Sequence, residues 1–270
     1  MKTVTVRLYN SLFIRYNRSM KPVIPTENRY HLIDVLRGAA IVSMIVYHFC
    51  YDYFVVCGVD PEFDRQTPII LWEQSICFLF IIVSGISLNF SRHPYRRGII
   101  INLCGFAITA ATVVFIPSQQ IWFGVLNLIG CAMLIAAALR KLFDRIHPAA
   151  GMLLSMTAFA LTYGVPMRYL GFFSIPFATL PNAMFSCKYL AFLGLPSDDF
   201  FSADFFPLIP WLFLFFFGVF LWRYIALRGR DGVFRFDVPA LSFFGRHSLI
   251  IYLIHQPILY VFCALICGRF

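Results

Sequence analysis

The chain has 270 residues, of which 60% are hydrophobic and 18% aromatic, and its formal net charge is +9 at pH 7. Only 13% of the residues are charged, and the mean hydropathy is +0.77. This composition excludes an ordinary water-soluble domain and indicates an integral membrane protein.

Residues 1–30 come first; they are polar and basic and lack the apolar core of a signal peptide, so we expect a cytoplasmic leader. One membrane domain, 31–270, should follow. Windows of about 20 apolar residues predict an all-α polytopic bundle of seven membrane-spanning helices. These windows lie at 36–57, 73–91, 98–116, 119–139, 149–165, 206–226 and 248–267. Prolines and a glycine interrupt the apolar stretch 170–195, which predicts a loop with a re-entrant or interfacial piece, or alternatively an eighth, broken span.

Lysine and arginine gather in alternate loops, which predicts the orientation because cationic short loops stay on the cytoplasmic side. The cations of these loops are Lys2, Arg7, Arg15, Arg18, Lys21, Arg29, Arg37, Arg92, Arg96, Arg97, Arg140, Lys141, Arg145, Arg223, Arg228, Arg230, Arg235 and Arg246. The opposite loops hold only four cations, along with six acidic residues. The cations are Arg65, Arg168, Lys188 and Arg269, and the acidic residues are Asp60, Glu62, Asp64, Asp198, Asp199 and Asp204. We therefore expect a plasma-membrane protein with a cytoplasmic N-terminus, and the positive charge reflects topology rather than a nucleic-acid-binding patch.

The cysteines show no paired spacing typical of a metal site, and no metal is expected. Six of the eight fall within predicted spans, where they suit the packing of small apolar side chains. These six are Cys50, Cys77, Cys104, Cys131, Cys263 and Cys267. Cys57 and Cys187 both fall on the predicted outer side, where they can form a disulfide if that compartment is oxidising.

The first predicted span contains the run LRGAAIVSMIVYHFCYD and, with the residues just before it, four ionisable groups: Asp34, Arg37, His48 and Asp52. At about 100° per residue these groups share one helix stripe roughly 60° wide. A charged group in hydrocarbon costs roughly 3 kcal/mol. The stripe should therefore face other helices or a wet cavity, and it marks a candidate functional path.

His48 is expected near the bilayer midplane, roughly 16 Å beyond Arg37 at about 1.5 Å per residue. Its imidazole can take a proton near neutral pH, and Asp52 one turn later can hold the other ring nitrogen, which predicts a catalytic base with an orienting carboxylate. A histidine that only bonds a neighbouring helix is the structural alternative. Arg37 either pairs with Asp34 or faces the phosphates of an anionic donor.

The last predicted span carries a second polar stripe in FFGRHSLIIYLIHQP, which makes Arg246, His255 and Gln256 candidate substrate-binding residues. His255 beside the Pro257 kink can also serve plain packing. Glu73 and Asp204 are candidates on the predicted outer side, although Glu73 can alternatively cap the second helix. Phosphate-loop, HExxH and GxSxG patterns do not occur, so ATP-driven transport and zinc hydrolysis lose support.

Five segments in the same order resemble the heparan-α-glucosaminide N-acetyltransferase catalytic family in its small bacterial members, within a wider group of transmembrane acyltransferases. The segments are LRGAAIVSMIVYHFCYD, FLFIIVSGIS, FGVLNLIG, FFSADFFPLIPWLFLFFFG and FFGRHSLIIYLIHQP, and the likeness covers about residues 30–267. It implies acyl transfer to a sugar or other envelope acceptor at the outer face of a bacterial inner membrane. The implied donor is cytoplasmic acyl-CoA, with acetyl-CoA as co-substrate and no bound cofactor.

The spacing of Arg37 and His48 matches an arginine and a histidine in the first helix of the wider group. In the lysosomal enzymes of the family, the residue that matches His48 is an asparagine, and the catalytic histidine follows in the loop after the first helix. Residues 49–72 here contain no histidine. The assignment of His48 as the catalytic residue is therefore based on the pattern of the wider group and on the polar stripe of the first helix. Specificity for a glucosaminide acceptor cannot be inferred from the family resemblance.

The sequence thus predicts a membrane-embedded acyltransferase in which Arg37 and further cytoplasmic arginines attract acyl-CoA, while His48, held by Asp52, handles the acceptor proton. The further arginines are Arg92, Arg96, Arg97 and Arg246. His48 acts as a general base or carries the acyl group covalently, and both routes stay open. The main alternative is a transporter or flippase with a proton relay. The common carrier folds contain inverted repeats, and the seven predicted spans show none, which argues against this alternative. A structural or regulatory membrane subunit is a third alternative, but it would give the polar stripe of the first span no function.

Overall fold

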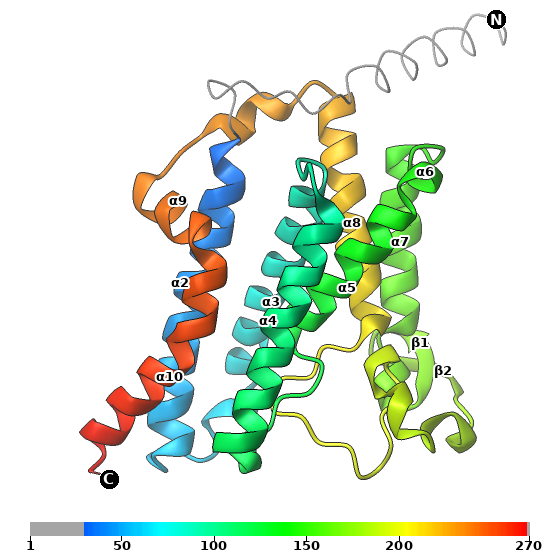
Figure 1. The fold of residues 1–270 in the computed structure, drawn as a ribbon. Helices are drawn as coiled ribbons and strands as arrows, with labels where there is room; N and C mark the ends of the chain where they lie inside the picture. Colours follow the sequence, from blue (N-terminus) through cyan, green and yellow to red (C-terminus); the bar gives the residue numbers. More distant parts are fainter. Residues whose placement is uncertain (1–29, 269–270) are drawn as a thin grey trace, which may run out of the picture.

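The computed structural model describes residues 30–268, which form an all-α polytopic membrane bundle with one small β-hairpin (Figure 1). Within this range, six helices are long and apolar enough to cross a membrane. They are α2 (His31–Tyr51) continued by the π-helical η2 (Asp52–Val56), α3 (Thr67–Leu88), α4 (Pro94–Phe115), α7 (Pro148–Thr162) continued by η5 (Val165–Met167), α8 (Leu208–Leu227) and α10 (Ser248–Ile266). The predicted leader, 1–30, lies outside the described residues except for Tyr30.

The fourth predicted span, 119–139, is a shorter helix, α5 (Val125–Ala138). The chain before it forms a 3₁₀ turn, η4 (Pro117–Gln119), and then an irregular segment in which Phe123 has a positive φ and which ends at Gly124. The 14 residues of α5 rise about 21 Å, which is less than the roughly 30 Å of the hydrocarbon core. The helix is present as predicted, but it is too short to be the full span that its apolar composition indicates.

Short elements connect these helices on both sides of the bundle. They are η3 (Phe63–Arg65), α6 (Arg140–Phe143), β1 (Tyr169–Phe172), β2 (Ile175–Thr179), η6 (Asn182–Phe185), η7 (Lys188–Leu193), η8 (Asp231–Arg235) and α9 (Pro239–Arg246). The apolar stretch 170–195 is therefore a loop, as predicted, but it forms no re-entrant α-helix and no eighth span. Pro176 and Pro181 interrupt a helix there, and aromatic and β-branched residues pair instead as antiparallel strands.

When the short helix α5 is counted, successive long helices from α2 to α8 run in opposite directions, so the bundle has two ends (Figure 1). Helices α2, α4 and α7 begin at the end that also holds Arg37, Arg97 and Arg223, which we call the basic side. The β-hairpin and the ends of α2 and α10 lie at the other end, which we call the hairpin side (Figure 1).

Aromatic side chains fill the interior between α5, α7 and α8. Phe159 of α7 and Phe215 of α8 are fully buried. Trp211 of α8 packs on Phe159 and on Phe78 of α3, with ring centroids 5.6 and 5.5 Å apart. Such close side-chain packing holds helices together in lipid, where apolar surfaces gain little from leaving the solvent. This half of the bundle is the scaffold against which α2, α9 and α10 are placed.

Helix α9 packs backbone against backbone on α2 through two glycines. A Cβ atom at Gly38 would overlap the carbonyl oxygen of Leu241, and one at Gly245 would overlap the carbonyl oxygen of Asp34. Small residues permit this close approach. As a result, the Gly245 carbonyl oxygen lies 3.3 Å from Arg37 Nη1, which fixes the basic end of α2 beside the start of α10.

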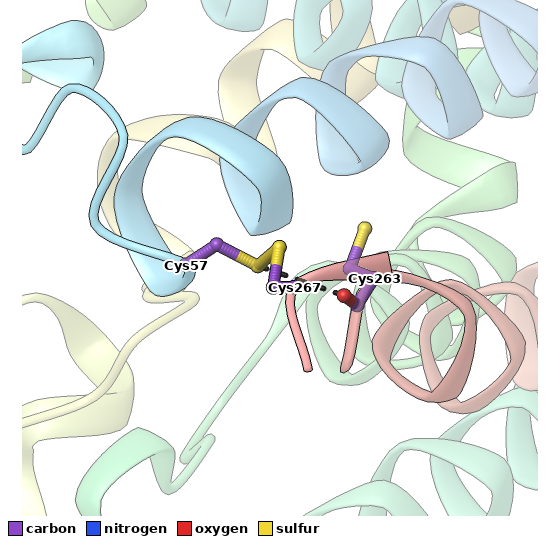
Figure 2. The surroundings of a disulfide bond; sticks show 3 residues. All are labelled: Cys57, Cys263 and Cys267. Atoms are coloured by element: carbon purple, nitrogen blue, oxygen red, sulfur yellow. Dashed lines mark hydrogen bonds between the residues drawn. A yellow bond between two sulfur atoms is a disulfide. The ribbon is translucent and has the colours of Figure 1, made fainter. Parts of the chain in front are cut away.

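A disulfide joins Cys57, just after η2, to Cys267, just after α10, on the hairpin side (Figure 2). The two Cα atoms are 6.3 Å apart, and the carbonyl oxygen of Cys263 lies 3.7 Å from Cys57 Sγ. The predicted bridge to Cys187 is wrong, because Cys187 is an exposed free thiol. The assignment of Cys267 to a span is also wrong, since α10 ends one residue earlier and leaves this side chain next to Cys57.

Replacing Cys57 with serine is expected to lower the thermal unfolding midpoint by roughly 5–15 °C, because a disulfide typically contributes about 2–4 kcal/mol. The bridge closes a separation of 210 residues. Cys187→Ser is the matched control and should leave the midpoint unchanged. The measurement is thermal unfolding in detergent with and without a reductant, and peptide mapping that recovers a Cys57–Cys187 bridge would contradict the assignment.

Candidate active site

A cavity of about 210 Å³ lies between α2, α3, α4, α5 and the start of α10. Its mouth on the basic side carries three guanidinium groups, from Arg37, Arg97 and Arg246. Its walls are largely apolar. Tyr252 of α10 and Leu126 of α5 line its inner end, towards the hairpin side.

Arg37 is held in place at this mouth by three contacts. Its Nη1 donates to Asp34 Oδ1 at 3.1 Å and to the Gly245 carbonyl oxygen, and its Nη2 donates to Ser87 Oγ at 2.6 Å. The predicted ion pair with Asp34 is therefore confirmed, and the same guanidinium lines the cavity. Ser87 was not identified from the sequence. Ser84 and Ser87 stand three residues apart in the otherwise apolar second half of α3, and this spacing is the signal that marks the face.

The four other arginines predicted to attract a donor divide into two pairs. Arg97 and Arg246 line the cavity, whereas Arg92 and Arg96 do not. All four side chains are exposed. Arg96 and Arg97 are neighbours at the start of α4, where consecutive residues point about 100° apart. The helix therefore turns only one of the two towards α10.

Tyr252 connects the cavity to the hairpin side. Its hydroxyl donates to Asp204 Oδ2 at 3.4 Å, and Asp204 lies in the segment that leads into α8. The Asp204 carboxylate also accepts from the backbone N–H of Val125, the first residue of α5, where a helix N-terminus favours negative charge. Asp204 thus contacts the cavity wall through Tyr252, while Gly124 leaves room for its carboxylate.

Burial raises the pKa of Asp204 from 3.8 to about 6. The folded protein then binds this proton more tightly than the unfolded chain, so the stability that the group contributes is fully present below pH 3.8 and is lost as the pH rises through about 6. Asp204→Asn removes the titration and keeps an oxygen acceptor. Relative to this variant, the thermal midpoint of the wild type should fall by a few degrees between about pH 4 and pH 7; parallel profiles would contradict the assignment.

Two histidines approach each other one turn beyond Tyr252. The rings of His48 on α2 and His255 on α10 have centroids 5.0 Å apart. His255 Nδ1 lies 2.7 Å from the Tyr252 carbonyl oxygen, which can only accept, so Nδ1 carries the proton and Nε2 presents a lone pair. This Nε2 is buried and has no hydrogen-bond partner among the described residues.

Asp52 does not hold His48 in the way that the sequence predicts. The Asp52 side chain is buried, and Gln256 Nε2 donates to its Oδ1 at 3.1 Å. Within residues 30–268 no hydrogen bond joins His48 to Asp52. The two residues share one helix face, but α10 places Gln256 opposite Asp52 and His255 opposite His48. The predicted base and carboxylate pair is therefore wrong, and the partner of the His48 ring is a second imidazole.

Glu73 lies within the bundle rather than at a helix start. Helix α3 begins at Thr67, almost two turns earlier, so the interpretation of Glu73 as a cap is wrong. Its carboxylate accepts from the Tyr47 hydroxyl at 3.0 Å. The buried Tyr47 ring also meets the His48 ring edge-on, with centroids 5.5 Å apart. Tyr47 escaped the sequence interpretation, since a single tyrosine in an apolar run gives no distinct signal.

These side chains form a polar path along the bundle. Cations stand at the basic side, the Tyr252 hydroxyl and the two imidazoles follow, and carboxylates lie towards the hairpin side. Two acceptor atoms on this path, His255 Nε2 and Gln256 Oε1, are buried without a partner among the described residues. Such atoms suit a ligand that brings N–H or O–H donors. Residues 30–268 hold no group of three or more His, Cys, Asp or Glu placed to bind a metal ion.

The sequence model of a known family matches residues 29–257, a range that includes every residue that lines the cavity. The family is described as heparan-alpha-glucosaminide N-acetyltransferase, catalytic. The chain belongs to this family. No curated protein and no solved structure matches it.

Membership of the heparan-alpha-glucosaminide N-acetyltransferase family makes the protein a multi-pass membrane acyltransferase. The family match ends at Pro257, directly after His255 and Gln256, so the whole polar path lies within it. The last two turns of α10 and Cys267 of the disulfide lie beyond it. The family resemblance inferred from the five sequence segments is thereby confirmed.

Proposed function

We propose that the protein transfers an acetyl group from acetyl-CoA, bound from the cytoplasm, to a hydroxyl or amine of a sugar acceptor at the outer face of the plasma membrane. One observation carries this proposal. A cavity with three guanidinium groups at the basic side ends at Tyr252, and the Tyr252 hydroxyl contacts Asp204 from the hairpin side. Donor and acceptor can therefore meet at one point without either crossing the membrane.

The mouth of the cavity suits the phosphates of coenzyme A. Guanidinium groups bind phosphate through paired N–H donors in a planar fork. Arg37 is oriented for this by Ser87 and the Gly245 carbonyl, whereas Arg97 and Arg246 are exposed and free to close on a ligand. The apolar walls suit the pantetheine arm, whose thioester would lie towards Tyr252.

The two histidines supply the proton transfer. In direct attack, an imidazole takes the proton of the acceptor N–H or O–H, the acceptor atom bonds to the thioester carbonyl carbon, and the C–S bond breaks to release the coenzyme A thiolate. In the covalent route, a ring nitrogen of His48 bonds to the thioester carbonyl carbon and the coenzyme A thiolate leaves. The acceptor then attacks this carbonyl carbon, gives its proton to the second imidazole, and the His48 nitrogen leaves. Two imidazolium rings 5.0 Å apart would repel, which favours a pair that holds a single added proton.

The distribution of charge supports the proposed orientation. The basic side holds most of the arginines and lysines, so it is assigned to the cytoplasm together with the N-terminus. The disulfide between Cys57 and Cys267 lies on the opposite side, which agrees with an oxidising compartment there.

Acetyl transfer by purified protein in liposomes tests this function. The protein is given acetyl-CoA labelled in the acetyl group, together with a panel of amino and hydroxyl sugars. Labelled sugar is the expected product, and the preferred acceptor class decides between N- and O-acetylation. Movement of an unmodified sugar across the bilayer without labelling would instead support the alternative of a transporter.

A further inference from the structure

A second pocket opens on the hairpin side, next to the segment that carries Asp204. Its volume is about 380 Å³, which lies within the roughly 300–1,000 Å³ of typical small-molecule sites. Its lining combines aromatic rings with polar groups, chiefly Arg168, Ser197, Asp198, Phe200, Phe201 and Phe205. No step of the proposed transfer uses these side chains.

The polar groups of this pocket are arranged as a neutral pair beside exposed rings. The Arg168 guanidinium bonds to the Asp198 carboxylate, so the two charges offset each other at the rim. The Phe201 side chain is 51% exposed, and the Phe200 and Phe205 rings pack together with centroids 4.9 Å apart. The pocket therefore offers apolar ring faces next to a donor and an acceptor of hydrogen bonds, without a net charge.

The pocket is fixed to the candidate active site through one short segment. The Ser202 hydroxyl, which lines the pocket, accepts from the Trp122 backbone N–H at 2.9 Å and lies 3.1 Å from the Asp204 carbonyl oxygen. Asp204 in turn contacts Tyr252 at the inner end of the cavity. A ligand in the pocket would thus lie beside the residues that separate the hairpin side from the donor cavity.

We propose that this pocket is the acceptor subsite and binds an uncharged hexose ring. The faces of a hexose carry C–H groups that pack on an aromatic ring, and its hydroxyls both donate and accept, as the Asp198 and Arg168 side chains require. The proposal rests on the proposed function for the link to acetyl transfer. Binding of the sugar to the pocket is independent of the donor and can be measured alone.

The test measures sugar binding to the full chain in lipid nanodiscs, without sugar-based detergent and without acetyl-CoA. Glucose and galactose, both uncharged hexoses, are the probes, and sorbitol, which has the hydroxyls but no ring, is the ligand control. Phe201→Ala and Asp198→Asn are each expected to weaken hexose binding about tenfold. Phe177→Ala, which removes a ring that is 68% exposed on the neighbouring hairpin and outside the pocket, should bind as the wild type does.

The proposal is overturned if the wild type shows no saturable hexose binding, if sorbitol binds equally well, or if Phe201→Ala and Phe177→Ala behave alike. Hexose binding that depends on Phe201 without any acetyl transfer would leave the subsite intact and remove the proposed function. Acetyl transfer whose acceptor KM is unchanged in Phe201→Ala would support the proposed function and exclude this pocket as the acceptor subsite.

Discussion

Replacing His48 with alanine is expected to lower acetyl turnover by roughly 10²–10⁴-fold, the range typical for loss of a general base. Acetyl-CoA affinity should change little, because the His48 ring does not line the donor cavity. The measurement pairs the rate of acetyl transfer at saturating donor with the Kd of acetyl-CoA for the same protein. Retained turnover in His48→Ala would remove this residue from the mechanism.

His247→Ala is the matched control for His48→Ala. His247 stands exposed at the start of α10, where its ring packs on Phe243, and its loss should alter neither the rate nor the affinity. His255→Ala should lower turnover as well, since its unpartnered Nε2 faces the same region. If the two imidazoles act as one unit, the double variant will be no slower than the worse single variant, as expected for coupled catalytic groups.

Trapping of the intermediate separates the two chemical routes. Direct attack leaves no modified protein when the acceptor is withheld, whereas the covalent route leaves an acetyl group on His48 that mass spectrometry detects. Both routes predict loss of turnover in His48→Ala. Labelling of His48 without acceptor, and its absence in His48→Ala, would establish the covalent route.

The membrane helices were predictable from the sequence because lipid demands long apolar segments, and length alone identifies them. Their ends and the connections were less predictable. The stretch 170–195 is as apolar as a span, but its prolines turn it into a hairpin and 3₁₀ turns. The helix predicted at 119–139 begins only at Val125, because Phe123 has a positive φ and Gly124 is extended, and hydropathy alone does not register such backbone conformations.

The candidate site was predictable up to the faces of single helices. The spacing of Arg37, His48 and Asp52 predicts that they point inward together, because that follows from helix geometry. The residue opposite each of them depends on how α10 packs against α2, which the sequence of one helix does not contain. Gln256 therefore donates a hydrogen bond to the Asp52 carboxylate, and the His48 ring lies beside the His255 ring.

Removing the exposed guanidinium groups of the donor cavity is expected to weaken acetyl-CoA binding by roughly 10–100-fold per group. A hydrogen bond to a charged partner contributes about 1.5–3 kcal/mol, and each tenfold change in Kd corresponds to about 1.4 kcal/mol. Arg97→Ala and Arg246→Ala remove groups that line the cavity. Turnover at saturating donor should stay near that of the wild type, since neither side chain lies near the histidines.

Arg37→Ala should have a still larger effect on donor affinity, but it also breaks an ion pair at the contact between α2 and α9. The exposed arginines therefore give the sharper comparison. The double variant Arg92→Ala, Arg96→Ala removes the same charge from the same side without touching the cavity lining. The double variant Arg97→Ala, Arg246→Ala is its counterpart in the cavity lining. If the two double variants lose affinity equally, and if salt abolishes the loss in both, the arginines act through a screened surface potential. A loss confined to Arg97 and Arg246 requires a donor bound within the cavity itself.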